Sequence, residues 1–154
     1  HQLFRKLAEA AYRDYGIKSL ALGIPEGRYE KTKWIEYKRV KWAEVIAYLK
    51  SAYLLVITSK IEGLPSVLLE AWACRCPVVS TPIPSLLKLN ELYENVLQIA
   101  DSFSFDDVYC SVLKVLEEKP RQMIEKALKV VREKFDARIV SQRYRELYEK
   151  LLNK

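Results

Sequence analysis

Apolar positions along the chain follow two periods, one typical of buried strands and one typical of helices. Short apolar runs bounded by polar or turn residues predict strands at 20–22, 53–58, 77–81 and 96–99. Residues 35–40 instead alternate between apolar and polar side chains, which predicts a strand with one wetter face near a sheet edge. Helical spacing predicts helices at 3–15, 43–51, 65–74 and 104–118, and two more after Pro120 and Asp136.

Strands that alternate with helices predict an α/β fold. Such an order favours a Rossmann-like parallel sheet with right-handed crossovers and with helices on both of its faces. The strand at 96–99 is expected to complete that sheet. A chain of 154 residues, half of them apolar, is suited to a single domain with a core of ordinary size.

Several residues mark where the predicted helices begin and end. Gly16 is expected to stop the first helix, whose buried face is predicted to contain Leu3, Leu7, Ala10 and Ala11. Ser104 with Asp107 is typical of a capping box, and Asp136 is expected to cap the last helix. That last helix has an apolar stripe made of Val140, Tyr144, Leu147, Tyr148 and Leu151.

The segment between the strands at 53–58 and 77–81 contains the candidate chemistry, and we call residues 59–70 the cradle. Strand, loop, helix and strand form the unit in which a ligand lies beyond the carboxyl ends of the strands. Pro65 suits the first helical position, so the free amides of Ser66, Val67 and Leu68 should favour an anion such as a phosphate. Gly63 removes a side chain where a ligand would approach the backbone.

Two glutamates flank this helix start. Glu70 follows Ser66 by four residues, which places it on the same helix face, roughly 6 Å further along the axis. A carboxylate there can accept hydrogen bonds from a ribose diol, while Glu62 can bind hydroxyl groups on whatever the diphosphate carries. The simpler alternative is that Glu62 is only a favourable charge near a helix start and Glu70 only a solvated surface residue.

The letters around the glutamates resemble the donor domain of family-4-type retaining glycosyltransferases of the GT-B fold. That family carries the pattern S-x-x-E-G-x-P-x-x-x-x-E-A-x-A-x-G-x-P-V-V. In this chain the matching positions are Ser59, Glu62, Gly63, Pro65, Glu70, Ala71, Ala73, Pro77, Val78 and Val79. The resemblance implies that residues 1–154 are the C-terminal half of a GT-B enzyme, the half that binds a nucleotide-diphosphate sugar.

The resemblance also implies roles for individual residues. Glu62 is the candidate catalytic residue, which positions the sugar, and the scheme requires neither a metal nor a cofactor. The candidate donor-binding residues are Gly63, Leu64, Pro65, Ser66, Val67, Glu70 and Val40. In the family, an N-terminal domain binds the acceptor, and an Arg and a Lys after the first strand clamp the diphosphate. Both features would precede His1, so this half is expected to be inactive alone, and part of the last helical stripe is expected to be exposed.

The chain departs from the family pattern at two places. Arg75 stands where the family usually has a glycine, in a position that is often left-handed. Residues 82–86 (PIPSL) replace a loop that is usually glycine-rich and followed by an acid. These departures leave open a non-catalytic module that binds a nucleotide or a partner protein.

The net charge is +6, and part of the positive charge is clustered between residues 28 and 42. There Lys and Arg alternate with Tyr29, Trp34, Tyr37 and Trp42. This pattern is compatible with a solvated edge strand, with a base pocket lined by Val40, or with an RNA-binding surface. The sequence favours the first two, so nucleic acid is the weakest of the three expectations.

The cysteine and histidine counts and the lengths of the apolar runs bear on metal sites, disulfides and location. Three cysteines and a single histidine, His1, do not make a convincing metal site or disulfide framework, so reduced thiols and a cytoplasmic location are expected. No apolar run approaches the roughly 18 residues of a membrane span, and no secretion-type leader is recognisable.

Overall fold

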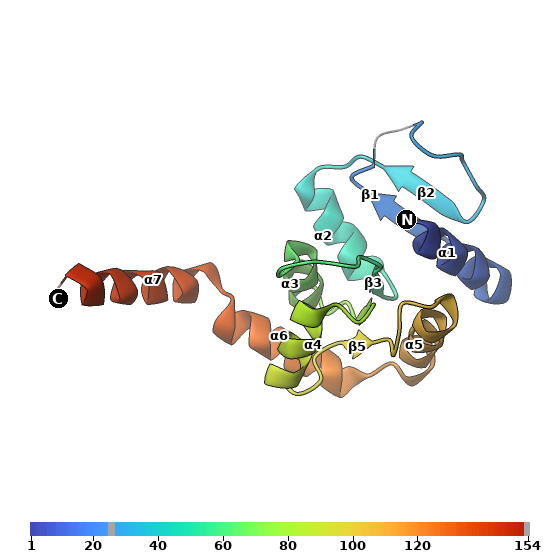
Figure 1. The fold of residues 1–154 in the computed structure, drawn as a ribbon. Coiled ribbons are helices and arrows are strands. Elements are labelled where there is room, and N and C mark those ends of the chain that lie inside the picture. Colours follow the sequence, from blue (N-terminus) through green and yellow to red (C-terminus); the bar gives the residue numbers. More distant parts are fainter. Residues whose placement is uncertain (25–26, 153–154) are drawn as a thin grey trace.

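The computed structural model describes residues 1–24 and 27–152, and these residues form seven helices and five strands (Figure 1). In chain order the elements are α1 (Gln2–Tyr15), β1 (Ser19–Leu22), β2 (Ile35–Lys38), α2 (Trp42–Ser51), β3 (Leu55–Ile57), α3 (Ser66–Ala73), β4 (Val78–Ser80), α4 (Pro84–Leu92), β5 (Gln98–Ile99), α5 (Phe105–Glu118), α6 (Arg121–Lys134) and α7 (Ala137–Leu152). The predicted alternation of strands and helices is confirmed, with boundaries that shift by a few residues.

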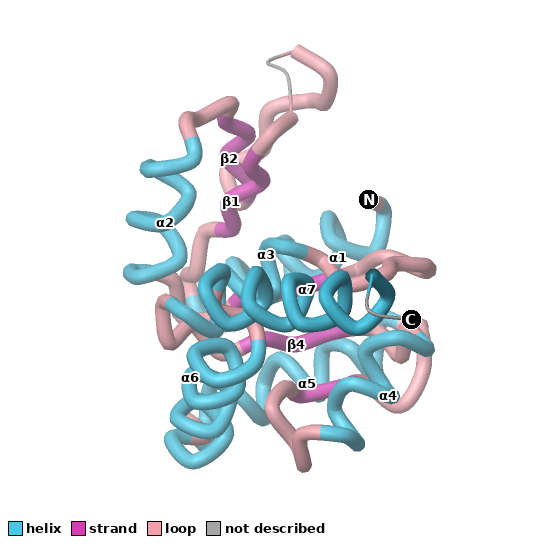
Figure 2. Tube along the Cα trace, turned by 90° about the vertical axis from the view of Figure 1, so that its left-hand side faces the viewer, coloured by secondary structure: helices cyan, strands magenta, loops and turns pink. Residues whose placement is uncertain are grey.

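The strands are parallel, but they form two sheets rather than one. β1 pairs with β2, with Ser19 opposite Ile35, and the second sheet has the order β3-β4-β5. Figure 2 shows β1 and β2 beside α2 and apart from β4. The strand predicted at 96–99 joins a sheet as expected, as β5 beside β4, but the expected single sheet was wrong, because the described strands form two. Hydrophobic periodicity identifies strands and does not show which strands share an edge.

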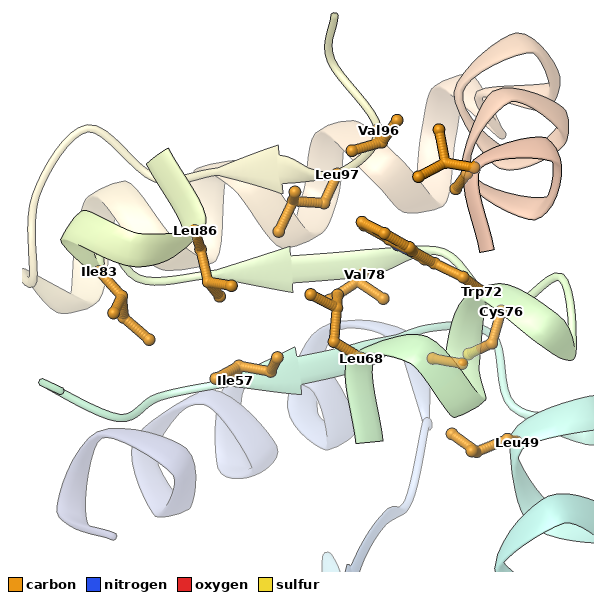
Figure 3. Packing of buried hydrophobic residues seen from close by; sticks show 13 residues of the cluster. Leu49, Ile57, Leu68, Trp72, Cys76, Val78, Ile83, Leu86, Val96 and Leu97 are labelled. Carbon is orange, nitrogen blue, oxygen red and sulfur yellow. The ribbon is translucent and has the colours of Figure 1, made fainter. Parts of the chain in front are cut away.

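The core is built around β4, whose two faces are both covered. Val78 and Val79 point to opposite faces and are both 0% exposed. Val78 belongs to a large cluster with residues of α2, α3, α4 and α6, whereas Val79 packs against Val112 and Val115 of α5. In Figure 3, Leu68 of α3 lies close to Val78, and Trp72 extends towards Val96 and Leu97. Helices on both faces confirm the α/β class.

Helix α1 packs against α5 and forms a smaller hydrophobic cluster with it. Leu7 packs with Ala100 and Val108, and Ala10 is buried as the helical pattern predicts. Ala8 is also buried, although it lies outside the predicted face. Helix α1 ends at Gly16, whose φ of 68° is left-handed, as expected for a helix stop.

The strand predicted at 53–58 is less buried than its apolar letters indicate. Ile57 is buried, but Leu55 and Val56 are only half-buried. The physical reason is that β3 is paired on one side only, by β4, among the described residues. A continuous apolar run predicts a strand whose two faces are both covered. That expectation was wrong for β3, which is only partly buried.

Side-chain caps fix the later helices as predicted. Ser104 accepts a hydrogen bond from the amide of Asp107 at 3.1 Å, which caps α5. Asp136 accepts one from the amide of Arg138 at 2.9 Å, which satisfies a free donor in the first turn of α7.

Helix α7 extends away from the rest of the molecule (Figure 1). It contains no buried residue, and its apolar stripe includes the exposed side chains of Tyr144, Leu147, Tyr148 and Leu151. The rings of Tyr144 and Tyr148 stack on each other, with centroids 6.3 Å apart. The expected exposure of this stripe is therefore confirmed.

Helix α3 ends in a left-handed residue that is not a glycine. Arg75 has a φ of 58°. The amide of Cys76 donates to the carbonyl of Ala71 at 2.9 Å, and the amide of Arg75 donates to that of Trp72 at 3.1 Å, which is the Schellman pattern. The Arg75 side chain forms an exposed ion pair with Glu125, at 3.3 Å between Nε and Oε1.

We predict that Arg75→Gly stabilises the chain by about 0.5–1 kcal/mol, because glycine adopts the left-handed region without the Cβ clash. The exposed ion pair that is lost contributes little. Urea unfolding measures the free energy, and Glu125→Ala, which removes the ion pair but keeps the backbone residue, should change it little. An Arg75→Gly variant less stable than the parent chain would contradict this reading of the helix end.

Candidate functional site

The cradle lies at the carboxyl ends of β3 and β4, between the starts of two helices. Its loop leaves β3 after Ile57 and enters α3 at Ser66, and α4 begins at Pro84 shortly after the end of β4. This is the edge of a parallel sheet at which ligands usually bind. Segment 82–86, which departs from the family pattern, forms the entry and first turn of α4.

Two hydroxyl groups beyond β4 hold the cradle loop in place. Thr81 is 0% exposed, and its Oγ1 donates to the carbonyl of Ser59 at 2.6 Å. Ser85 Oγ, in the first turn of α4, donates to the carbonyl of Glu62 at 2.8 Å. The loop is therefore fixed by β4 and α4 as well as by its own residues.

The carboxylate of Glu62 has a partner within the same loop. Ser59 Oγ donates to Glu62 Oε1 at 2.7 Å, and the Glu62 side chain is half-buried. Ser59 and Glu62 both belong to the glycosyltransferase pattern recognised in the sequence. Their hydrogen bond fixes one carboxylate oxygen and leaves Oε2 without a hydrogen-bond donor among the described residues.

The start of α3 differs by one residue from the expectation. Pro65 is the cap, with φ −66° and ψ 126°, and Ser66 is the first helical residue. The amide of Leu68 is not free, because it donates to the carbonyl of Pro65 at 3.1 Å in a tight first turn. Within residues 1–24 and 27–152, the amides of Ser66 and Val67 have no acceptor. Two of the three expected donors therefore remain.

Gly63 lies in open space beside these amides. A Cβ built on it would meet no atom within 4 Å among the described residues, and its φ is outside the left-handed region. The fold itself would accept a side chain at this position, so nothing in the described structure requires a glycine. Gly63, Leu64 and Ser66 are all exposed, and the cradle is an open surface.

Glu70 lies one turn into α3, on the face that includes Ser66. Its Oε1 accepts a hydrogen bond at 3.2 Å from the indole Nε1 of Trp42, the first residue of α2. Glu70 is half-buried, whereas the Trp42 side chain is 67% exposed. Val40 is half-buried in the segment that joins β2 to α2.

Several side chains of the basic and aromatic region contact other side chains of the same part of the chain. Tyr29 stacks on Tyr37 with centroids 5.4 Å apart, and the His1 ring lies tilted against Tyr29 with centroids 3.9 Å apart. Lys38 pairs with Glu36 at 3.0 Å and donates to Tyr48 Oη at 3.2 Å. The side chains of Tyr29, Tyr37 and Lys38 are therefore engaged within the chain, whereas a nucleic-acid surface uses free rings and free cations.

The sequence did not identify Thr81, Ser85 and Trp42 as site residues. Thr81 follows β4 directly, so the rule that ligands bind beyond strand ends is a signal that could have found it. Ser85 lies in the helix start after the same strand, where the same signal applies. Trp42 is 28 positions from Glu70, and no local pattern links the two.

The cysteines are unpaired, and they lie outside the cradle. Burial raises the pKa of the Cys76 thiol to about 11, and burial also raises the pKa of Cys74. In the part of the chain that the structure describes, no group of three His, Cys, Asp or Glu residues could hold a metal ion. No described helix is long and apolar enough to cross a membrane.

Comparisons with known proteins identify a family and a fold for this chain. Residues 28–130 match the family model described as glycosyl transferases group 1. Among solved structures, the chain resembles sucrose-phosphate synthase from Thermosynechococcus elongatus, with a TM-score of 0.79 and 15% sequence identity. The match covers 96% of this chain and 41% of that one, and it shows a shared GT-B fold. A search of curated protein sequences found no match.

We predict that Thr81→Val destabilises the chain by about 1–3 kcal/mol, because it keeps the side-chain volume but leaves the Ser59 carbonyl without its donor. Urea unfolding measures the loss. Ser80→Ala is the matched control: Ser80 is equally buried, but its hydroxyl donates to the carbonyl of Thr81 rather than to the cradle loop. Amide hydrogen exchange at residues 59–63 should accelerate in Thr81→Val only, and equal exchange in both variants would remove Thr81 as a support of the cradle.

Proposed function

Because this chain belongs to the glycosyl transferases group 1 family, we propose that it binds the nucleotide-diphosphate-sugar donor of a retaining glycosyltransferase. The single observation that carries the proposal is the helix start of α3, where the amides of Ser66 and Val67 have no acceptor among the described residues and stand in sequence between Glu62 and Glu70. A helix start with free amides is suited to a phosphate, and carboxylates are suited to sugar hydroxyls. The open position of Gly63 supports the close approach of a ligand.

The proposed reaction breaks the bond between the anomeric carbon of the sugar and the diphosphate. An acceptor hydroxyl forms the new bond at that carbon with net retention, and its proton passes to the departing nucleoside diphosphate. The amides of Ser66 and Val67 would stabilise the negative charge that develops on the leaving phosphate. Glu62, already oriented by Ser59, would position the sugar, and Glu70 would position the ribose.

We also propose that the chain is one half of a two-domain enzyme and that the other half binds the acceptor. The chain spans 41% of the length of the sucrose-phosphate synthase structure that it matches. A doubly wound sheet has six parallel strands in the spatial order 3-2-1-4-5-6. In this chain β2 and β1 correspond to strands 3 and 2 of that order, and β3, β4 and β5 correspond to strands 4, 5 and 6. The place of strand 1 falls between β1 and β3, which supports a first strand outside these residues. The unpaired thiols support the proposed cytoplasmic location.

We predict that a nucleoside diphosphate, such as UDP or GDP, binds this chain weakly. Millimolar ligand should shift the amide signals of Gly63, Ser66 and Glu70 in NMR spectra, because these residues surround the proposed phosphate and ribose sites. Glu70→Ala should weaken binding by about tenfold through the loss of charge-assisted hydrogen bonds.

Glu117→Ala is the matched control for this titration, because it removes the same charge from an exposed position on α5. Its affinity should equal that of the parent chain. The absence of any shift at the cradle would remove the donor-site proposal. Tight RNA binding whose affinity falls steeply with salt and is unchanged in Glu70→Ala would favour the nucleic-acid alternative instead.

We further predict that the isolated chain transfers no sugar. A donor site alone lacks the acceptor group that must be held close to the anomeric carbon in a cleft closed to water. Release of nucleoside diphosphate from a panel of nucleotide sugars measures the activity, on the same preparation whose nucleotide binding NMR has recorded. Transfer above the rate without protein would contradict the two-domain proposal.

A further inference from the structure

Trp42 is an exposed aromatic residue with an unusual contact. Its side chain is 67% exposed, whereas Trp72 in the core is 1% exposed. Tryptophan is usually well buried, so an exposed ring at a helix start has a large apolar surface in water. Its indole N–H nevertheless donates to Glu70 Oε1, at 3.2 Å, across from α2 to α3.

The backbone around Trp42 is held firmly. The amide of Lys41 donates to the Glu44 carboxylate at 3.0 Å, and the carbonyl of Lys41 accepts from the amide of Glu44 at 3.0 Å. These bonds fix the first turn of α2, so Trp42 is presented from a rigid element rather than from a loop. The ring therefore has a defined place beside Glu70.

The position of Glu70 determines what the ring can contact. In the function proposed above, on which this inference rests, Glu70 binds the ribose diol. The ribose ring carries its base next to that diol, so a flat ring within hydrogen-bond distance of Glu70 lies within reach of the base. Aromatic side chains bind nucleobases by stacking, with little dependence on which base is present.

We propose that Trp42 is a donor-binding residue that forms an aromatic platform for the nucleobase. Its indole N–H donates to Oε1 of Glu70, and Oε2, which has no donor among the described residues, stays available to the ribose. Trp42 thus acts on the donor in two ways: by direct stacking on the base and by positioning Glu70. The chemical class of ligand is a nucleoside diphosphate, in contrast to a diphosphate that lacks a nucleoside.

Three probes separate these contributions: UDP, GDP and inorganic pyrophosphate, each titrated against the 154-residue chain. The shifts of Gly63 and Ser66 report the affinity. Trp42→Ala should weaken UDP and GDP by about tenfold, because it removes both the stacking surface and the N–H. Trp42→Phe keeps a ring and loses the N–H, so it should weaken them by only about threefold. Pyrophosphate should bind equally to all three chains.

Tyr53→Ala is the matched control. Tyr53 is a similarly exposed aromatic residue, at 71%, but it precedes β3 and so lies at the opposite end of the sheet from the cradle. Its removal should leave all three affinities unchanged. Thermal unfolding of each variant is recorded alongside, and Trp42→Ala should unfold close to the parent chain because its side chain is exposed.

The possible failures are distinguishable. If Glu70→Ala weakens the nucleotides and Trp42→Ala does not, this inference is wrong and the donor-site proposal remains. If Trp42→Ala weakens pyrophosphate as much as UDP, the ring supports the fold of the cradle and is not a base platform. If no probe binds to the parent chain at millimolar concentration, both this inference and the donor-site proposal are wrong.

Discussion

The burial of β4 on both faces is the constraint on which the rest of the structure depends. Val78 and Val79 are both fully buried, so helices must cover the two sides of the strand. α3, α4 and α6 contribute to the cluster around Val78, and α5 covers Val79. The same strand ends just before Thr81, whose hydroxyl fixes the cradle loop. The core and the candidate site are thus built on one short strand, and the position of the site follows from the packing of the fold.

Features that depend on neighbouring residues were predictable from the sequence. The stop at Gly16 and the cap at Ser104 need only a few adjacent positions, and both are present in the structure. The start of α3 was predicted to within one residue, but the tight turn that engages the Leu68 amide was not. Apolar runs identified the strands. They could not show that β1 and β3 are unpaired with each other, because strand pairing depends on contacts distant in sequence.

The two glutamates of the candidate site illustrate the same limit. Glu62 is bound by Ser59, three residues away, and both belong to the pattern that the sequence displays. The Glu70 carboxylate accepts from Trp42 of another helix, and Ser85, from beyond β4, donates to the main-chain carbonyl of Glu62. A motif therefore located the carboxylates, but only the folded chain shows what orients them. Those orienting residues determine which carboxylate oxygens remain accessible to a ligand.

The exposure of α7 has a consequence for how the chain responds to heat. A helix without buried residues receives almost no stabilisation from packing and depends on its own backbone bonds. At 16 residues it is only marginally stable in water by the standards of isolated helices. Its helix–coil transition should therefore be gradual and should begin well below the cooperative melting of the β4 core. Circular dichroism of this chain would then show a sloping loss of helix before the main transition, and a two-state fit would underestimate the unfolding enthalpy.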